Sequence, residues 1–114
     1  MSRRIYMGEV FIADLGEPTG HEQGYRRPAV VVSPPRYNSM ASEMVVVVPL
    51  TSTNRHLAHH VPLDHVRAGL DRPCVARCED VRSVSKARLG RFLGKATTHD
   101  LHEIREMVRV LLDL

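Results

Sequence analysis

The sequence contains no tryptophan and has only 4% aromatic residues, which limits how it could contact nucleic acid. The aromatic residues are scattered along the chain: Tyr6, Phe11, Tyr25, Tyr37 and Phe92. Such a set makes a poor platform for stacking bases, so an RNP-type or oligonucleotide-barrel reader is disfavoured.

Long apolar runs are also missing. The longest one, Met44–Leu50, contains Pro49 and is far shorter than the ~20 residues that a membrane span needs. The start of the chain is basic, but no apolar signal-peptide core follows it. We therefore expect a cytoplasmic protein with no membrane contact.

Cysteine is scarce, and the two that are present lie four residues apart, at Cys74 and Cys78, in a segment with the pattern of a strand. Four strand residues span about 13 Å, whereas a disulfide needs Cα atoms within about 7 Å. We therefore predict two buried free thiols.

Histidine is more frequent, but the spacing of the histidines matches no standard set of zinc ligands. The four nearest to one another are His56, His59, His60 and His65. We expect His59 and His60 to point to opposite sides of a strand, because successive strand residues alternate. The prediction is no metal site, no cofactor and a polar, exposed loop.

The remaining composition is that of a globular protein, with 43% hydrophobic and 25% charged residues and a net charge of +3. This length predicts one domain over residues 1–114. The charge weakly favours an anionic partner. Short apolar segments at close spacing predict strands: Glu9–Asp14, Pro28–Ser33, Met44–Leu50, His60–Leu63, Cys74–Cys78, Asp80–Val84 and Arg91–Lys95. The segments at 74–78 and 80–84 form either one long bent strand or two.

The end of the chain changes to a helical period. Leu101, Ile104, Val108 and Leu111 recur at helical spacing, and Met107 and Leu112 widen the stripe. Thr97 and Asp100 have the spacing of a capping box. We predict a helix of about four turns that packs on a small barrel or sandwich, with a turn or short helical piece at Arg36–Met40. One convincing helix argues against a helix-turn-helix DNA reader.

The segment that precedes the strand at 28–33 concentrates polar chemistry. A histidine, a carboxylate, an amide and two arginines lie within Gly20–Arg27. Pro28 favours an extended conformation for Arg27, which holds this guanidinium at the mouth of a buried strand. A guanidinium fixed in this way suits bidentate recognition of a phosphate. The alternative is a strand-end arginine paired with a carboxylate.

Two further places are candidates for the site. Thr51 directly follows the apolar strand at 44–50, so it meets Arg27 at one sheet edge if the two strands are neighbours; otherwise it is a turn-capping residue. In the segment 77–82, a straight strand would place Arg77 and Glu79 on one face and Asp80 and Arg82 on the other. The alternative here is an ordinary cross-strand ion pair.

The ordered set of these segments resembles the MazF/PemK/Kid family of toxins. The resemblance is carried by Gly8-Glu9-Val10-Phe11, Asp14-Leu15, Gly20-His21-Glu22-Gln23, Arg27-Pro28-Ala29-Val30-Val31, Tyr37-Asn38, Val48-Pro49-Leu50-Thr51-Ser52, Arg82-Ser83-Val84 and Gly94. It covers essentially the whole chain. It implies a mainly β protein, namely a small SH3-like (CcdB/PemK-like) β-barrel with a short helix and a C-terminal helix packed on it.

The resemblance also implies an activity. Members are metal-independent, ribosome-independent endoribonucleases of type II toxin–antitoxin modules that cut single-stranded RNA at short sequences and act as homodimers. Their partner is an antitoxin of the MazE/PemI type with an acidic, partly disordered segment. The mechanism is attack of the RNA 2′-OH on the adjacent phosphorus.

Family motifs assign roles to particular positions. The resemblance implies catalytic roles for Arg27, Thr51, His21, Arg77 and Glu79, where Glu79 stands in place of the aspartate of the Kid-like branch. It implies RNA binding by Glu22, Gln23, Arg26, Ser52, Asp80 and Arg82. The general base stays open among Glu79, Glu22 and His21. The alternatives to a ribonuclease are a non-catalytic, CcdB-like toxin that binds gyrase and an inactive SH3-like interaction module.

Overall fold

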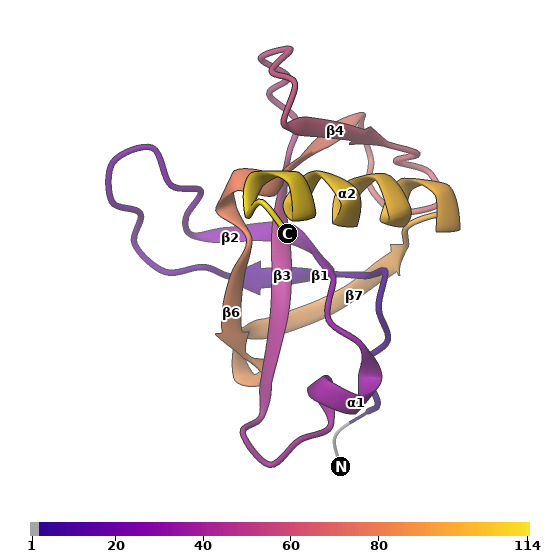
Figure 1. Cartoon of the computed structure of the whole chain (residues 1–114). Helices are drawn as coiled ribbons and strands as arrows, with labels where there is room; N and C mark the ends of the chain where they lie inside the picture. Colours follow the sequence, from indigo (N-terminus) through magenta and orange to yellow (C-terminus); the bar gives the residue numbers. More distant parts are fainter. Residues whose placement is uncertain (1–2) are drawn as a thin grey trace.

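A computed structural model describes residues 3–114 of the chain, which form an antiparallel sheet crossed by one long helix (Figure 1). The strands are β1 (Glu9–Asp14), β2 (Arg26–Val31), β3 (Met44–Thr51), β4 (His60–Leu63), β5 (Cys74–Arg77), β6 (Arg82–Ser85) and β7 (Leu89–Lys95). The helices are α1 (Pro35–Asn38) and α2 (Thr98–Leu111), with short 3₁₀ turns η1 (Cys78–Asp80) and η2 (Lys86–Arg88). None of the helices in this part of the chain has the length and apolar character needed to cross a bilayer.

The sheet is built around β3, which has neighbours along both edges. The strand order is β4-β5-β3-β2-β1-β7, and β6 also pairs with β3. On one edge β3 pairs with β2; on the other, residues 44–47 pair with β6 and residues 50–51 pair with β5. No pairing within residues 3–114 joins β4 to β7, so the sheet is open, and the closed barrel expected from the sequence is not observed.

The central strands β2 and β3 carry apolar residues on both faces, and both faces are buried. Val30 and Val48 pack with Ile104 of α2 on one side, and Val31 and Val47 pack with residues of β1 and β6 on the other. A continuous apolar run is the pattern of a strand covered on both sides, which explains the segments at 28–33 and 44–50.

Most predicted elements are confirmed, with β1 and β4 at their predicted bounds. The predicted strand at 28–33 lies two residues earlier, at Arg26–Val31. Pro28 fits because the pairing of β2 with β3 begins only at Ala29, so no ladder bond to β3 is needed from Pro28.

The segment 74–84 forms two strands, β5 and β6, joined by η1. Of the two alternatives for this segment, two strands is therefore the correct one, and the alternation of Arg77, Glu79, Asp80 and Arg82 that a straight strand would give is not observed. The chain turns at Cys78–Asp80 because β5 and β6 pair with different parts of the same edge of β3. Cys74 and Cys78 are buried and free, as predicted.

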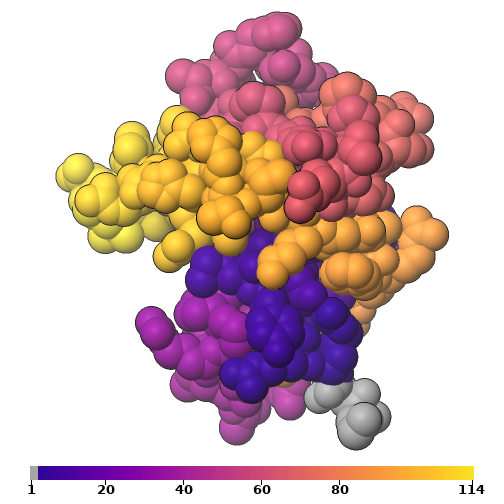
Figure 2. Space-filling view, turned by 90° about the vertical axis from the view of Figure 1, so that its right-hand side faces the viewer, coloured from indigo at the N-terminus to yellow at the C-terminus, as the bar shows by residue number. Residues whose placement is uncertain are grey.

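The predicted C-terminal helix is confirmed as α2, which runs across the middle of the face in Figure 2. Thr97 Oγ1 accepts a hydrogen bond from the Asp100 amide at 3.0 Å, which is one half of the predicted capping box. The Asp100 carboxylate accepts instead from the Asp64 amide at 2.7 Å and so ties the turn after β4 to the helix. The stripe is buried at Ile104, whereas Leu111 and Leu112 are exposed.

Candidate active site

Four strand ends and two loops converge on a polar cavity of about 200 Å³, which we call the strand-end cavity. It lies where β2 and β4 begin and where β3 and β5 end, neighbouring positions in an antiparallel sheet. Its lining is almost entirely polar: Gln23, Arg27, Thr51, Thr53, Arg55, His60 and Arg77. The sheet order therefore brings together residues that are far apart in sequence.

Arg27 and Thr51 both line this cavity, as expected if their strands are neighbours. Arg27 is exposed, and its Nε donates to the Gly24 carbonyl at 3.2 Å, which leaves the rest of the guanidinium for a ligand. Thr51 Oγ1 accepts from the Thr53 amide at 3.2 Å, so its hydroxyl proton stays available. Arg26 is not among the lining residues: its guanidinium lies close to Gly90 of β7.

Arg77 fastens the loop at 15–25 to the end of β5. Its Nη1 donates to Gln23 Oε1 at 2.6 Å, and its Nη2 donates to the His21 carbonyl at 2.8 Å. Its Nε lies 3.2 Å from Asp80 Oδ2 and 3.5 Å from Glu79 Oε2, and Asp80 Oδ2 also accepts from the Gln23 amide at 3.1 Å. Much of the polar capacity of Arg77, Gln23 and Asp80 is therefore used within the protein.

A second cavity of about 420 Å³ adjoins the first, because both are lined by Arg55, His60 and Arg77. We call it the loop cavity; its other lining residues are Gly20, His21, Glu22, Leu57 and Glu79. His21, Glu22 and Glu79, the three candidate bases, thus share the loop cavity, while Arg27 and Thr51 lie in the strand-end cavity. Glu22 Oε1 accepts from the Thr19 amide at 2.9 Å.

The predictions for His59 and His60 need correction. His59 belongs to the turn before β4 and only His60 is in the strand, so the two rings do not alternate across a sheet. Both Nε2 atoms point to Glu79 Oε2, at 3.5 Å from His59 and 2.8 Å from His60. His60 is buried, whereas an exposed polar loop was expected.

The environment of Glu79 favours its ionised form. Burial alone would raise the pKa of this carboxyl group, but hydrogen bonds from His60 and the backbone, together with the nearby charge of His60 and His59, outweigh it. The net effect is a pKa below the ordinary value for glutamate.

The same three side chains could be considered as metal ligands, since their donor atoms lie within 4.8 Å of one another. Histidines that bind metals almost always donate their second ring N–H to an acceptor. His60 Nδ1 is buried and has no hydrogen-bond partner, and the Arg77 guanidinium lies 3.5 Å from the same carboxylate oxygen. The donor set suits a hydrogen-bonded cluster better than a divalent ion.

The other predicted residues lie at the margin of the two cavities or beyond it. Ser52 is exposed in the bend after β3. Arg82 is exposed on β6, and its Nη1 donates to the Leu15 carbonyl at 3.0 Å, which ties β6 to the start of the loop. Neither side chain lines the strand-end cavity or the loop cavity.

Sequence reasoning missed His60, Thr53 and Arg55. A signal for the last two exists, because Thr51, Thr53 and Arg55 alternate along a segment that continues β3 and so share a face where it stays extended.

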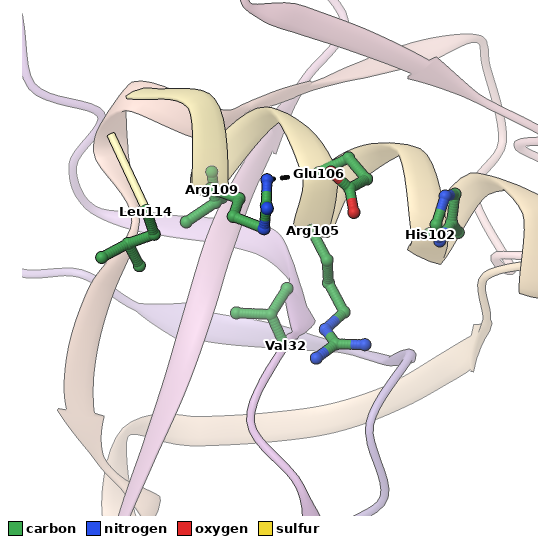
Figure 3. Close-up of a pocket in the computed structure, with 7 residues that line it drawn as sticks. Val32, His102, Arg105, Glu106, Arg109 and Leu114 are labelled. Carbon is green, nitrogen blue, oxygen red and sulfur yellow. Dashed lines mark ion pairs between the residues drawn. The ribbon is translucent and has the colours of Figure 1, made fainter. Parts of the chain in front are cut away.

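A separate cavity of about 320 Å³ lies along α2, and none of the predicted site residues lines it (Figure 3). In this cavity Glu106 pairs with Arg109 at 3.6 Å.

Comparisons with known proteins cover nearly the whole chain. A family model described as PemK-like, MazF-like toxin of type II toxin-antitoxin system matches residues 6–112. Endoribonuclease MazF9 of Mycobacterium tuberculosis is 35% identical over 112 residues, covering 94% of this chain and 95% of the relative. Endoribonuclease toxin MazF of Escherichia coli K12 is 32% identical over 107 residues, covering 93% and 92%.

Solved structures of MazF proteins also have a fold similar to that of this chain. A crystal structure of MazF from Deinococcus radiodurans has a TM-score of 0.86 at 29% identity, covering 99% of this chain and 100% of that chain. A MazE–MazF structure from the same organism has a TM-score of 0.80 at 28% identity, covering 99% of each chain.

Proposed function

This chain belongs to the family of PemK-like, MazF-like toxins of type II toxin–antitoxin systems, and we propose that it is an mRNA interferase. It cuts single-stranded mRNA at a short sequence without a metal or the ribosome, and thereby inhibits translation and growth. We place it in the cytoplasm, where its substrate is, as a single toxin domain over residues 1–114 with an SH3-like, partly open barrel.

The observation that carries this proposal is the composition of the strand-end cavity. Three arginines, Arg27, Arg55 and Arg77, line this cavity of about 200 Å³ together with two threonines. Guanidinium groups and a hydroxyl donor suit a phosphate, whose oxygens accept several hydrogen bonds at once. A toxin that acts only by binding a protein has no need for such a set.

The chemistry follows from the charge that develops on the phosphate. The 2′-oxygen attacks the adjacent phosphorus, its proton passes to a base, and the P–O5′ bond breaks as the 5′-oxygen takes up a proton. Arg27 stabilises the negative charge on the phosphorane, and the Thr51 hydroxyl donates to a phosphate oxygen. The products carry a 2′,3′-cyclic phosphate and a 5′-OH.

We assign the general base to Glu79. Its pKa is held below the ordinary value, so it is ionised at neutral pH. It lines the loop cavity 3.5 Å from the guanidinium of Arg77, a residue that lines both cavities. His21 and Glu22 line the same loop cavity and contact the RNA there. Arg77 contributes charge beside Glu79, while Gln23, Arg26, Ser52, Asp80 and Arg82 extend the RNA-binding surface.

The family also implies the partners. The toxin acts as a homodimer, and an antitoxin of the MazE/PemI type neutralises it. The antitoxin's acidic segment competes with RNA for the arginines of the strand-end cavity, and the net charge of +3 is compatible with such a ligand.

A ribonuclease assay on synthetic RNA in EDTA tests the proposal. We expect cleavage in EDTA, products with 2′,3′-cyclic or 3′-phosphate ends, and loss of cleavage when the nucleotide 5′ to the cut is replaced by its 2′-deoxy form. Continued cutting of the deoxy substrate would exclude attack by the 2′-OH. A protein that binds its antitoxin but cuts no RNA would favour the CcdB-like or inactive alternatives.

A further inference from the structure

Three side chains hold one carboxylate oxygen of Glu79. His60 Nε2 lies 2.8 Å from Oε2, His59 Nε2 lies 3.5 Å away, and Arg77 Nε lies 3.5 Å away. The two histidine rings meet edge to face, with centroids 4.9 Å apart and planes at 80°. All three of these side-chain contacts fall on Oε2.

The contact between His60 and Glu79 involves a buried histidine ring. The side chain of His60 is only 3% exposed at the start of β4, next to the buried residues Val61 and Leu63. Its Nδ1 is buried without a hydrogen-bond partner, whereas its Nε2 lies 2.8 Å from Glu79 Oε2, which accepts the hydrogen bond. Burying a polar ring costs free energy unless it is hydrogen-bonded, and for His60 the bond to Glu79 offsets part of that cost.

We propose that His60 is a positioning residue that orients the Glu79 carboxylate and keeps it ionised for proton abstraction. This inference rests on the proposed role of Glu79 as general base. His60 lines both cavities, but its side chain is only 3% exposed and its Nε2 contacts Glu79, so we assign it no direct contact with the substrate. Fixing a carboxylate in one orientation limits the reorganisation needed when the 2′-OH arrives.

The balance of charges around Glu79 supports this role. Burial of Glu79 acts to raise the pKa of its carboxyl group, and the hydrogen bond from His60 is the largest influence that lowers it. Other titratable or charged groups approach the pair from every neighbouring segment: His59, Arg77, Asp80, His21, Glu22 and Arg55, and His99 and Glu103 of α2 on the far side of His60. Of these, His59 and Arg77 contact the carboxylate directly.

Removing the hydrogen bond from His60 should therefore shift the pKa of Glu79 in a defined direction. Without it, the largest influence that lowers the pKa of Glu79 is lost, and this pKa rises from its wild-type value. The ionised base is then lost at a higher pH, so the acidic limb of the kcat/KM profile moves upward. A loss of fold stability alone would lower the active fraction without moving this limb.

The experiment compares pH profiles of kcat/KM for wild type, His60→Leu and His60→Gln, all in EDTA so that no divalent ion can occupy His59, His60 and Glu79. Leucine fills the site without a donor, whereas the glutamine Nε2 can reach the position of the histidine Nε2. We expect His60→Leu to lose part of the roughly 10²–10⁴-fold supplied by a general base, mostly at acidic pH. His60→Gln should restore the wild-type acidic limb.

Two further measurements separate this inference from the proposed function. Glu79→Gln reports on the base: if it cleaves RNA at the wild-type rate, Glu79 is not the base, although the protein is still a ribonuclease. Carboxyl NMR titration of Glu79 in wild type and His60→Leu reports on the contact even if His60→Leu is too weak to assay. An unchanged Glu79 titration, or a His60→Leu profile identical to that of wild type, would overturn the proposal.

Discussion

Replacement of Arg27 is the sharpest test of the site, because the structure separates its effect on activity from its effect on stability. The Arg27 side chain makes one hydrogen bond within the described chain, from Nε to the Gly24 carbonyl at 3.2 Å. Losing a bond with a charged donor costs about 1.5–3 kcal/mol. A domain of ordinary stability, about 5–15 kcal/mol, stays folded after such a loss.

The expected loss of activity is larger. If Arg27 meets the charge that develops on the phosphorane, Arg27→Ala should lower kcat by about 10²–10³, or about 2.7–4 kcal/mol. Arg27→Lys should also be strongly impaired, because lysine keeps the charge but loses the planar fork that holds two phosphate oxygens. Initial rates on a synthetic oligonucleotide should be measured together with urea unfolding of each variant.

Arg26→Ala is the matched control. Arg26 is adjacent in sequence and carries the same charge, but it lies toward Gly90 and not in the strand-end cavity. Its loss should weaken RNA binding modestly and leave kcat nearly unchanged. If Arg26→Ala were the more damaging change at equal stability, or if Arg27→Ala unfolded the protein, the placement of the site would be wrong.

Two further predictions concern Thr51 and Cys78. Thr51→Val removes a hydroxyl from the strand-end cavity and should lower kcat/KM about tenfold, the value of one hydrogen bond, whereas Thr51→Ser should retain activity; equal rates for valine and serine would refute the contact. Burial, with a smaller influence from Glu79, raises the pKa of the Cys78 thiol to about 12. Iodoacetamide at pH 8 should therefore label Cys78 only in denaturant, and mass spectrometry that found rapid labelling of the native protein would contradict this burial.

The fold was predictable where one local pattern decides the structure. The valine-rich runs around Val30 and Val48 are apolar on both faces, and such runs become strands covered on both sides. The helix at the C-terminus follows from its period and from the Thr97 cap. The start of β2 was less predictable, because whether Pro28 is tolerated depends on where pairing with β3 begins.

The sequence left open whether residues 74–84 form one long bent strand or two. Glu79 and Asp80 interrupt an otherwise strand-like segment, but local composition does not say whether the chain turns there. The chain turns because β5 and β6 occupy different lengths of one edge of β3, which is a property of the whole sheet. This turn brings Glu79 and Asp80 to the same side of Arg77, which the expected alternation would have separated.

The contacts of His60 show most clearly why local sequence patterns could not predict the whole site. His60 and Glu79 are 19 residues apart, and Arg77 and Gln23 are 54 apart, so no spacing rule connects them. The register of β4 with β5 places His60 opposite Arg77, and so brings His60 close to Glu79, which follows Arg77 by two residues. Arg77 then contacts both the loop, through Gln23, and the carboxylate of Glu79. One guanidinium therefore joins the loop to the carboxylate of Glu79, a connection that only the folded sheet creates.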